Sequence, residues 1–148
     1  MISINKDSIS HITSSIPSIP KKYYGFSGAQ LPNRDLVICG GDIRYYTNNQ
    51  YLHYKEGSNQ WRKVGTMKKA IFDHSSVWID GRFLTTGDDL QSSRKETSYH
   101  EEFSFVGGVK KRKKMLLPLR LHTSTTFDQN RMIVCGGRDR SVSQTFSN

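Results

Sequence analysis

Cysteine and long apolar runs are both scarce in this chain of 148 residues. The two cysteines, Cys39 and Cys135, lie far apart and each precedes a glycine pair, so the pattern of a disulfide-stapled secreted domain is missing and a reducing compartment is expected. No stretch is apolar for long enough to cross a bilayer or to form a signal-peptide core. These absences predict a soluble, cytoplasmic protein without a membrane partner.

Hydrophobic and acidic residues are also in short supply. Hydrophobic residues make up 34% of the chain, which predicts a small or shared core rather than one large one. Asp and Glu number 13 against 22 Lys and Arg, and the formal charge of +9 would attract acidic partners at low salt. Five basic residues form a single run, Lys110, Lys111, Arg112, Lys113 and Lys114.

An internal repeat is the main positive signal in the sequence. Met67 and Met115 lie 48 residues apart, and so do His74 and His122. The segments that lead from apolar residues into glycine follow the same period, because residues 35–41 resemble residues 131–137 and residues 82–88 lie between them. A fixed period of this length is typical of proteins built from stacked repeating units.

Local signals within one period predict short strands separated by turns. Residues 74–79 and 82–86 read as two strands joined by an Asp80-Gly81 hairpin turn. In the preceding period, residues 51–54 and 61–64 read as a third and a fourth strand. Four antiparallel strands make one blade of a β-propeller, so the sequence predicts an all-β fold.

The repeat resembles the kelch signature. In that signature a glycine pair ends the second strand, a Tyr lies in the third, a Trp follows seven residues later, and Met and His lead into the next blade. The resemblance covers about residues 9–137 and weakens in the second unit, where Val109 falls at the Trp position and Phe103 or Phe105 replaces the Tyr. The repeat positions are Gly40, Gly41, Tyr54, Trp61, Met67, His74, Gly87, Met115, His122, Gly136 and Gly137.

This resemblance implies a kelch-type β-propeller fragment with two complete four-stranded blades and partial blades at each end. Residues 1–8 are expected to be a flexible segment, 9–140 the partial propeller and 141–148 a tail. Within the propeller, 9–19 would be the outer strand of a preceding blade, 24–67 and 72–115 whole blades, and 121–137 the start of a further one. Since propellers close with about four to eight blades, this chain is predicted to expose blade edges through which copies could associate.

The residues that could carry chemistry have structural interpretations as well. His74 and His122 share one phase of the repeat, which favours packing over metal ligation, and His11, His53 and His100 have no spacing suited to a metal site. The glycine pairs lack the following helix that a phosphate loop needs, and they are expected to lie where a side chain would collide with the adjacent blade. Both cysteines are expected to be buried at strand ends. The sequence thus predicts no catalytic residue, no metal and no cofactor.

Two surface features remain as candidates for binding. The loops after the glycine pairs hold Arg and Tyr, the residues favoured at interface hot spots, and Asp88-Asp89 follows the glycine of the second unit. The basic run overlays residues 62–66 by period, so it would form the outermost strand of a blade, where lysine blunts pairing with other sheets. The alternatives are a nuclear localisation signal and a contact with nucleic acid or anionic lipid. The candidate partner-binding residues are Arg44, Tyr45, Tyr46, Arg138 and Arg140.

The leading functional hypothesis is a kelch-repeat module that binds another protein or peptide, as part of a substrate adaptor or scaffold. The alternatives are a fragment of a galactose-oxidase-like kelch enzyme, whose Tyr, Cys and His ligand set is not matched here, and a basic nucleic-acid-binding protein. Nucleic-acid binding is the weaker of these interpretations, because no aromatic residue interrupts the basic run for base stacking.

Overall fold

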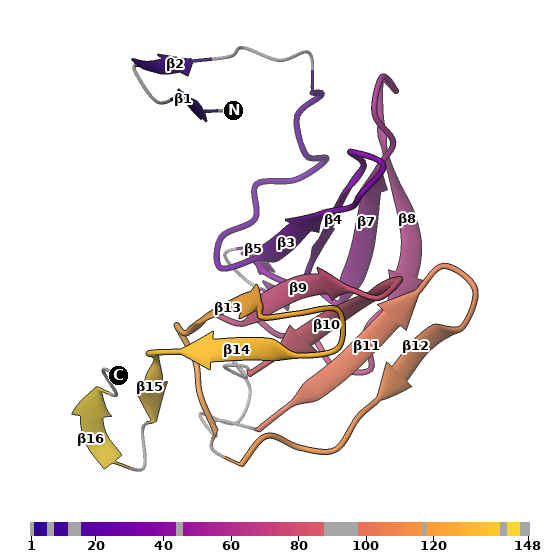
Figure 1. Ribbon diagram of the computed structural model, residues 1–148. Coiled ribbons are helices and arrows are strands. Elements are labelled where there is room, and N and C mark those ends of the chain that lie inside the picture. The colour runs from indigo at the N-terminus through magenta and orange to yellow at the C-terminus, as the bar shows by residue number, and fades with distance from the viewer. Residues whose placement is uncertain are drawn as a thin grey trace.

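The structure is a computed structural model that describes residues 2–5, 8–11, 16–43, 46–87, 98–116, 118–139 and 142–145. Within these ranges the chain forms strands and turns and contains no helix, so the all-β prediction is confirmed. The strands form several small antiparallel sheets, none of which closes on itself (Figure 1).

The first sheet has the strand order β3-β4-β7-β8, and every neighbouring pair is antiparallel. Its strands are β3 (Ser27–Gln30), β4 (Leu36–Cys39), β7 (Gln50–Tyr54) and β8 (Trp61–Thr66). Buried Val37 and Cys39 alternate along β4 with residues of the opposite face, as expected for a strand packed between layers. The sheet lies within the range in which the first four-stranded unit was expected.

The second sheet has the order β12-β11-β10-β9. Its strands are β9 (Ser75–Ile79), β10 (Arg82–Thr86), β11 (His100–Ser104) and β12 (Gly108–Lys111). Asp80 and Gly81 both adopt positive φ, at 47° and 71°, as a two-residue hairpin turn requires, so the turn predicted at this pair is confirmed.

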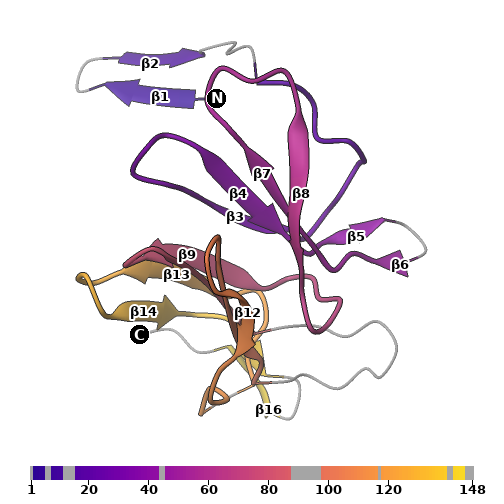
Figure 2. The same cartoon turned by 90° about the vertical axis from the view of Figure 1, so that its right-hand side faces the viewer.

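A third, two-stranded sheet follows, made of β13 (Thr123–Thr126) and β14 (Met132–Cys135). The first strands of the three sheets stack in chain order, with β9 in contact with β3 on one side and with β13 on the other (Figures 1 and 2). The core between the first and second sheets is built around Tyr51, whose ring stacks on Phe103 at 4.6 Å and meets the edge of Phe83 at 5.8 Å. The core is therefore shared between sheets, as the low hydrophobic content predicts.

Three short hairpins lie outside the predicted pattern. They are β1 (Ile2–Asn5) with β2 (Ser8–His11), β5 (Asp42–Ile43) with β6 (Tyr46–Thr47), and β15 (Arg138–Asp139) with β16 (Val142–Thr145). Residues 1–8 were expected to be flexible and 9–19 to be an outer strand, whereas β1 and β2 pair with each other and residues 16–19 are not in a strand. Local pairing gives the backbone groups of these segments partners that the main sheets do not supply.

Glycines are required where β4 and β10 end. A Cβ on Gly40 would lie 2.4 Å from the His74 ring, and one on Gly87 would lie 2.3 Å from the His122 ring. Both glycines also have positive φ, at 64° and 72°. The expectation that glycine avoids a collision with the next unit is therefore confirmed at both positions.

The other repeat positions also find equivalent places in the first two sheets. Tyr54 pairs with Trp61 in the same way that Phe103 pairs with Val109, so Phe103 rather than Phe105 takes the Tyr position. Tyr54 is buried, whereas Trp61 is partly exposed and donates its ring N–H to the Pro17 carbonyl at 3.0 Å. The backbone N–H of Met67 and of Met115 donates to Asn49 and Ser98 respectively, in the turn before the third strand.

Candidate functional site

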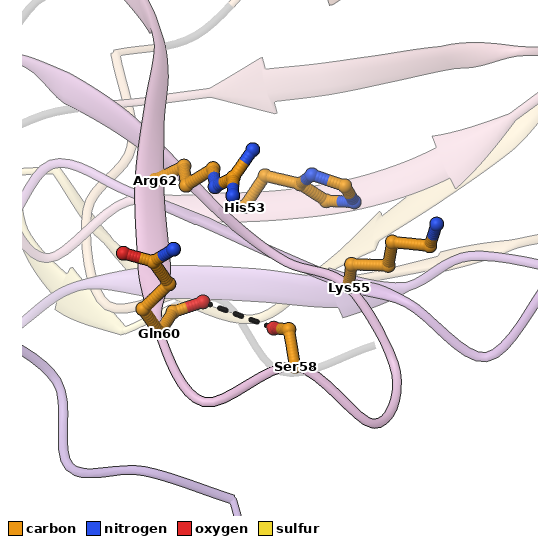
Figure 3. A pocket seen from close by; sticks show the side chains of 5 residues that line it. All are labelled: His53, Lys55, Ser58, Gln60 and Arg62. Carbon is orange, nitrogen blue, oxygen red and sulfur yellow. Dashed lines mark hydrogen bonds between the residues drawn. The ribbon is translucent and has the colours of Figure 1, made fainter.

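A recess of about 260 Å³ opens at the β7–β8 hairpin of the first sheet (Figure 3). His53 on β7 and Arg62 on β8 are cross-strand neighbours, which brings an imidazole and a guanidinium onto one face of the hairpin. The turn is held by Ser58, whose hydroxyl donates to the Gln60 carbonyl at 3.1 Å. The residues that line the recess are His53, Lys55, Ser58, Gln60 and Arg62.

Asp35 fixes the imidazole of His53, which lines this recess. Its Oδ2 lies 2.9 Å from His53 Nε2, and its carboxylate also accepts from the Asn33 amide at 2.9 Å and from the Glu56 backbone N–H at 2.8 Å. Burial acts to raise the pKa of Asp35, but the hydrogen bonds from Glu56, His53 and Asn33 outweigh it and hold the pKa below its usual value. Asp35 is therefore an anion that orients His53 toward the recess.

The remaining charges leave the recess with an excess of positive groups. Glu56 is engaged by Arg34 at 3.1 Å. Among the residues that the structure describes, no acid lies within ion-pair distance of Lys55 or Arg62. Two long basic side chains therefore remain available to an anionic group in this recess.

An exposed aromatic side chain from the second sheet lies beside the recess. Phe105, in the turn between β11 and β12, meets the His53 ring at 4.9 Å between centroids and is 48% exposed. Its other ring contacts are Phe103 at 5.3 Å and Trp78 at 6.1 Å, and its neighbour Val106 is fully exposed. An apolar anchor beside cationic side chains is a common composition for an interface centre.

The loop residues proposed from the sequence are not part of this recess. Tyr46 lies before β7, whereas the recess lies after it, so the two are at opposite ends of that strand. Tyr46 is half-exposed, its hydroxyl accepts from Lys21 Nζ at 2.8 Å, and the ammonium lies 5.4 Å from the ring centroid. Arg138 is exposed and its backbone pairs with Arg120. Three further candidates, Arg44, Tyr45 and Arg140, and the Asp88-Asp89 pair lie outside the described residues.

The buried histidines are held between sheets. His74 Nε2 lies 3.3 Å from Cys39 Sγ, and His122 Nε2 lies 3.0 Å from Thr86 Oγ1, which is the equivalent contact one unit later. Burial lowers the pKa of His74 to about 3, with a further contribution from His122, and burial also lowers the pKa of His122. Both rings are therefore neutral near pH 7.

Cys39 and His74 do not form a reactive dyad. Burial raises the pKa of the Cys39 thiol to about 12, against weaker opposing hydrogen bonds from Thr85 and Ser76. A thiol that stays protonated is a poor nucleophile. No group of three or more metal-ligating side chains is found in the described part of the chain.

The prediction that both cysteines are buried is wrong for Cys135, which is exposed. Cys39 is covered by His74 and Ser76 of the following sheet. Cys135 has the same place in the third sheet, but within the described residues it is not covered as the second sheet covers Cys39. The exposure of Cys135 thus reports an uncovered sheet face.

The basic run begins in β12, which is an edge strand of the second sheet, as expected. Lys110 and Lys111 lie opposite Glu102 and Glu101 in the register. Arg112 reaches the buried Glu102 carboxylate at 2.5 Å, so one member of the run has a structural contact. No helix long and apolar enough to cross a membrane occurs among the residues described.

Comparison with known proteins supports the fold. No family model and no curated protein matches the sequence. The structure is similar to a solved structure described as "Structure of YjhT", with a TM-score of 0.68 and 15% sequence identity over 84% of this chain. This chain spans 37% of that one. The similarity shows that this all-β fold occurs in part of a larger known structure.

Proposed function

We propose that the chain is a kelch-type propeller segment that binds an acidic segment of another protein. The kelch-like repeat, the stacked four-stranded sheets and the fold similarity support the architecture. The binding proposal rests on Lys55 and Arg62, which have no acidic partner among the described residues, and on exposed Phe105 beside them. In this interpretation a partner carboxylate enters the recess and an apolar partner residue covers Phe105 and Val106.

The charged side chains and the aromatic side chain would contribute to binding in different ways. Rim charges mainly speed encounter and select the partner, while a desolvated aromatic anchor contributes more of the affinity. Lys55 and Arg62 disfavour a partner that carries a cation into the recess, because like charges repel. An acidic peptide with a neighbouring apolar residue therefore fits the site better than a nucleic acid, whose binding would need stacked aromatics within the basic surface.

The test is titration calorimetry with two synthetic peptides, one with paired glutamates followed by Leu and Phe, the other with glutamines in place of the glutamates. The glutamate peptide should bind more tightly. Lys55→Gln and Arg62→Gln should each weaken binding by about two- to fivefold, which corresponds to roughly 0.4–1 kcal/mol. Phe105→Ala should weaken it further.

Lys63→Gln is the matched control, because Lys63 neighbours Arg62 on β8, is exposed and does not line the recess. This variant removes the same charge and should leave peptide affinity nearly unchanged. Equal losses for the Lys63 and Arg62 variants would show diffuse attraction to the basic chain rather than a site. Equal affinity for the two peptides would reject the acidic partner.

A further inference from the structure

The three stacked sheets are joined by a ladder of backbone hydrogen bonds at one position of the repeat. Gly25, Asp73 and Leu121 are spaced by 48 residues, and each lies two residues before the first strand of its sheet. Asp73 N–H donates to the Gly25 carbonyl at 2.9 Å, and Leu121 N–H donates to the Asp73 carbonyl at 2.9 Å. Each unit therefore accepts from the unit that follows it.

The backbone at these positions has one shared conformation. The φ angles are 62° at Gly25, 54° at Asp73 and 53° at Leu121. Non-glycine residues rarely adopt positive φ. Asp73 and Leu121, the non-glycine residues at this repeat position, both do so, and both donate in the ladder. The positive φ therefore goes with the hydrogen bonds between sheets and does not depend on one type of side chain.

The ladder is open at both ends within the described chain. Within the described ranges, the Gly25 N–H donates to no backbone carbonyl and the Leu121 carbonyl accepts from no backbone N–H. The Gly25 carbonyl and the Leu121 N–H do take part in the ladder. A backbone N–H or C=O without a partner in its own chain can pair with a group of another chain. The first and third sheets thus end the ladder with a donor and an acceptor respectively.

The side chains around these ends are exposed. On the third sheet, Ser124 faces the second sheet through Thr86, so Thr125, Ile133 and Cys135 point the other way. Ile133 and Cys135 are both exposed, whereas Cys39, the equivalent of Cys135, is covered by the next sheet.

The outer face of the first sheet has the complementary features. Gly28 on β3 faces away from the second sheet and is exposed, while Ala29 packs against the shared core. Phe26 is 40% exposed and occupies the repeat position of His74, whose ring covers Gly40 and Cys39 of the preceding unit. This face therefore presents the groups that the third sheet would meet in a following unit.

We propose that copies of this chain associate head to tail through these two faces. The Gly25 N–H of one copy donates to the Leu121 carbonyl of the next, Phe26 lies over Gly136, and the first sheet covers Ile133 and Cys135. The occupant is a second copy because the same contact is already made twice within the chain, in the same register and polarity. The two faces differ, so the interface is heterologous.

The test is sedimentation velocity of the full chain over a wide range of protein concentration. The mass should rise with concentration. Phe26→Glu places a charge on the first-sheet face, and Ile133→Glu places one on the third-sheet face. Each should abolish that rise. Leu116→Glu introduces the same charge at a fully exposed residue outside both proposed surfaces and should leave association intact.

Mixing the Phe26→Glu and Ile133→Glu variants tests whether the two different faces bind each other, head to tail. Each retains the face that the other lacks, so the mixture should form a heterodimer that does not grow further. A wild-type chain that stays monomeric at all concentrations would overturn the proposal, and so would a mixture that fails to associate. Circular dichroism checks that the variants are folded.

A readout on the wild-type chain covers the case in which a variant fails to fold. Cys135 is covered in the proposed interface, so its rate of labelling by a maleimide should fall as protein concentration rises. A rate independent of concentration would contradict the proposal without any substitution.

Discussion

Among single residues, His74, which is buried between two sheets, should make the free energy of unfolding depend on pH. The unfolded chain binds a proton on this residue at pH 6.5 and below, whereas burial lowers the pKa in the fold to about 3. The unfolded state therefore binds more protons in this window, and the free energy of unfolding should fall as the pH drops from about 6.5 toward 3. The loss from His74 is on the order of a few kcal/mol, and His122 acts in the same direction.

His74→Gln should flatten this dependence in urea unfolding measured at several pH values. Cys39→Ser is the control, because it alters the same buried contact and leaves the titrating ring in place. An unchanged slope for the His74 variant would show that other groups cause the acid sensitivity.

The two cysteines should differ sharply in reactivity. At neutral pH a thiol reagent should modify exposed Cys135 in the folded chain and reach Cys39 only after unfolding, since Cys39 is buried and its pKa is raised to about 12. Mass spectrometry of chains labelled before and after denaturation checks this, and Cys135→Ser should remove the early label. Early modification of Cys39 would mean that the first two sheets separate readily.

At the scale of elements, Glu101 joins β11 to the first sheet. This fully buried carboxylate accepts from Tyr51 Oη at 2.8 Å, from the Lys68 backbone N–H at 2.9 Å and from the Tyr99 hydroxyl. Glu101→Leu would remove the shared acceptor of these three hydrogen bonds and should destabilise the fold by about 2–5 kcal/mol. Tyr99→Phe, which removes one donor, should cost about 1 kcal/mol in the same chemical denaturation experiment.

A leucine at residue 101 has a precedent in the first sheet. Leu52 lies opposite Ile38, two residues before Gly40, just as Glu101 lies opposite Thr85, two residues before Gly87. If Glu101→Leu proved neutral, apolar packing alone would be sufficient between these sheets.

Within the basic run, Arg112 should matter for stability and its neighbours should not. Arg112 pairs with buried Glu102 but is itself partly exposed, so Arg112→Gln should cost only about 1 kcal/mol. Lys113→Gln and Lys114→Gln should leave the melting temperature unchanged, because these exposed lysines follow the edge strand. Equal effects of all three changes would argue against the Glu102 contact.

Strand positions were predictable because turn residues and alternation are local. The Asp80-Gly81 turn and the glycines at 40 and 87 follow from backbone chemistry that recurs in each unit. The exposure of Cys135 was not predictable, because its local sequence resembles that of Cys39 and only the following sheet distinguishes them.

The recess required long-range information. His53 and Arg62 meet through a pairing that includes a register shift between Tyr51 and Leu52, and Phe105 arrives from another sheet. The polar turn after residue 54 was the available signal, but it did not indicate a concave site. The loop candidates Arg44, Tyr45 and Arg140 remain predictions.

At the scale of the whole molecule, the two proposed interactions should respond differently to salt. The chain carries a formal charge of +9, and exposed charges are screened beyond about 8–10 Å at physiological ionic strength. Added sodium chloride should therefore weaken binding of the acidic peptide. It should not weaken head-to-tail association, which relies on backbone groups and apolar faces. Calorimetry and sedimentation across one salt series measure both, and parallel losses would indicate that self-association is electrostatic.

The ladder of Gly25, Asp73 and Leu121 also determines which deletions and duplications such a chain can accept during evolution. Donor and acceptor belong to the same residue of each unit, so removal of residues 73–120 would place Leu121 where Asp73 now lies, with its N–H facing the Gly25 carbonyl. Duplication of that stretch would likewise insert one more matched unit. A gene of this kind can lose or gain whole units while every junction stays compatible, whereas an insertion of another length within a unit would move its ladder residue out of phase.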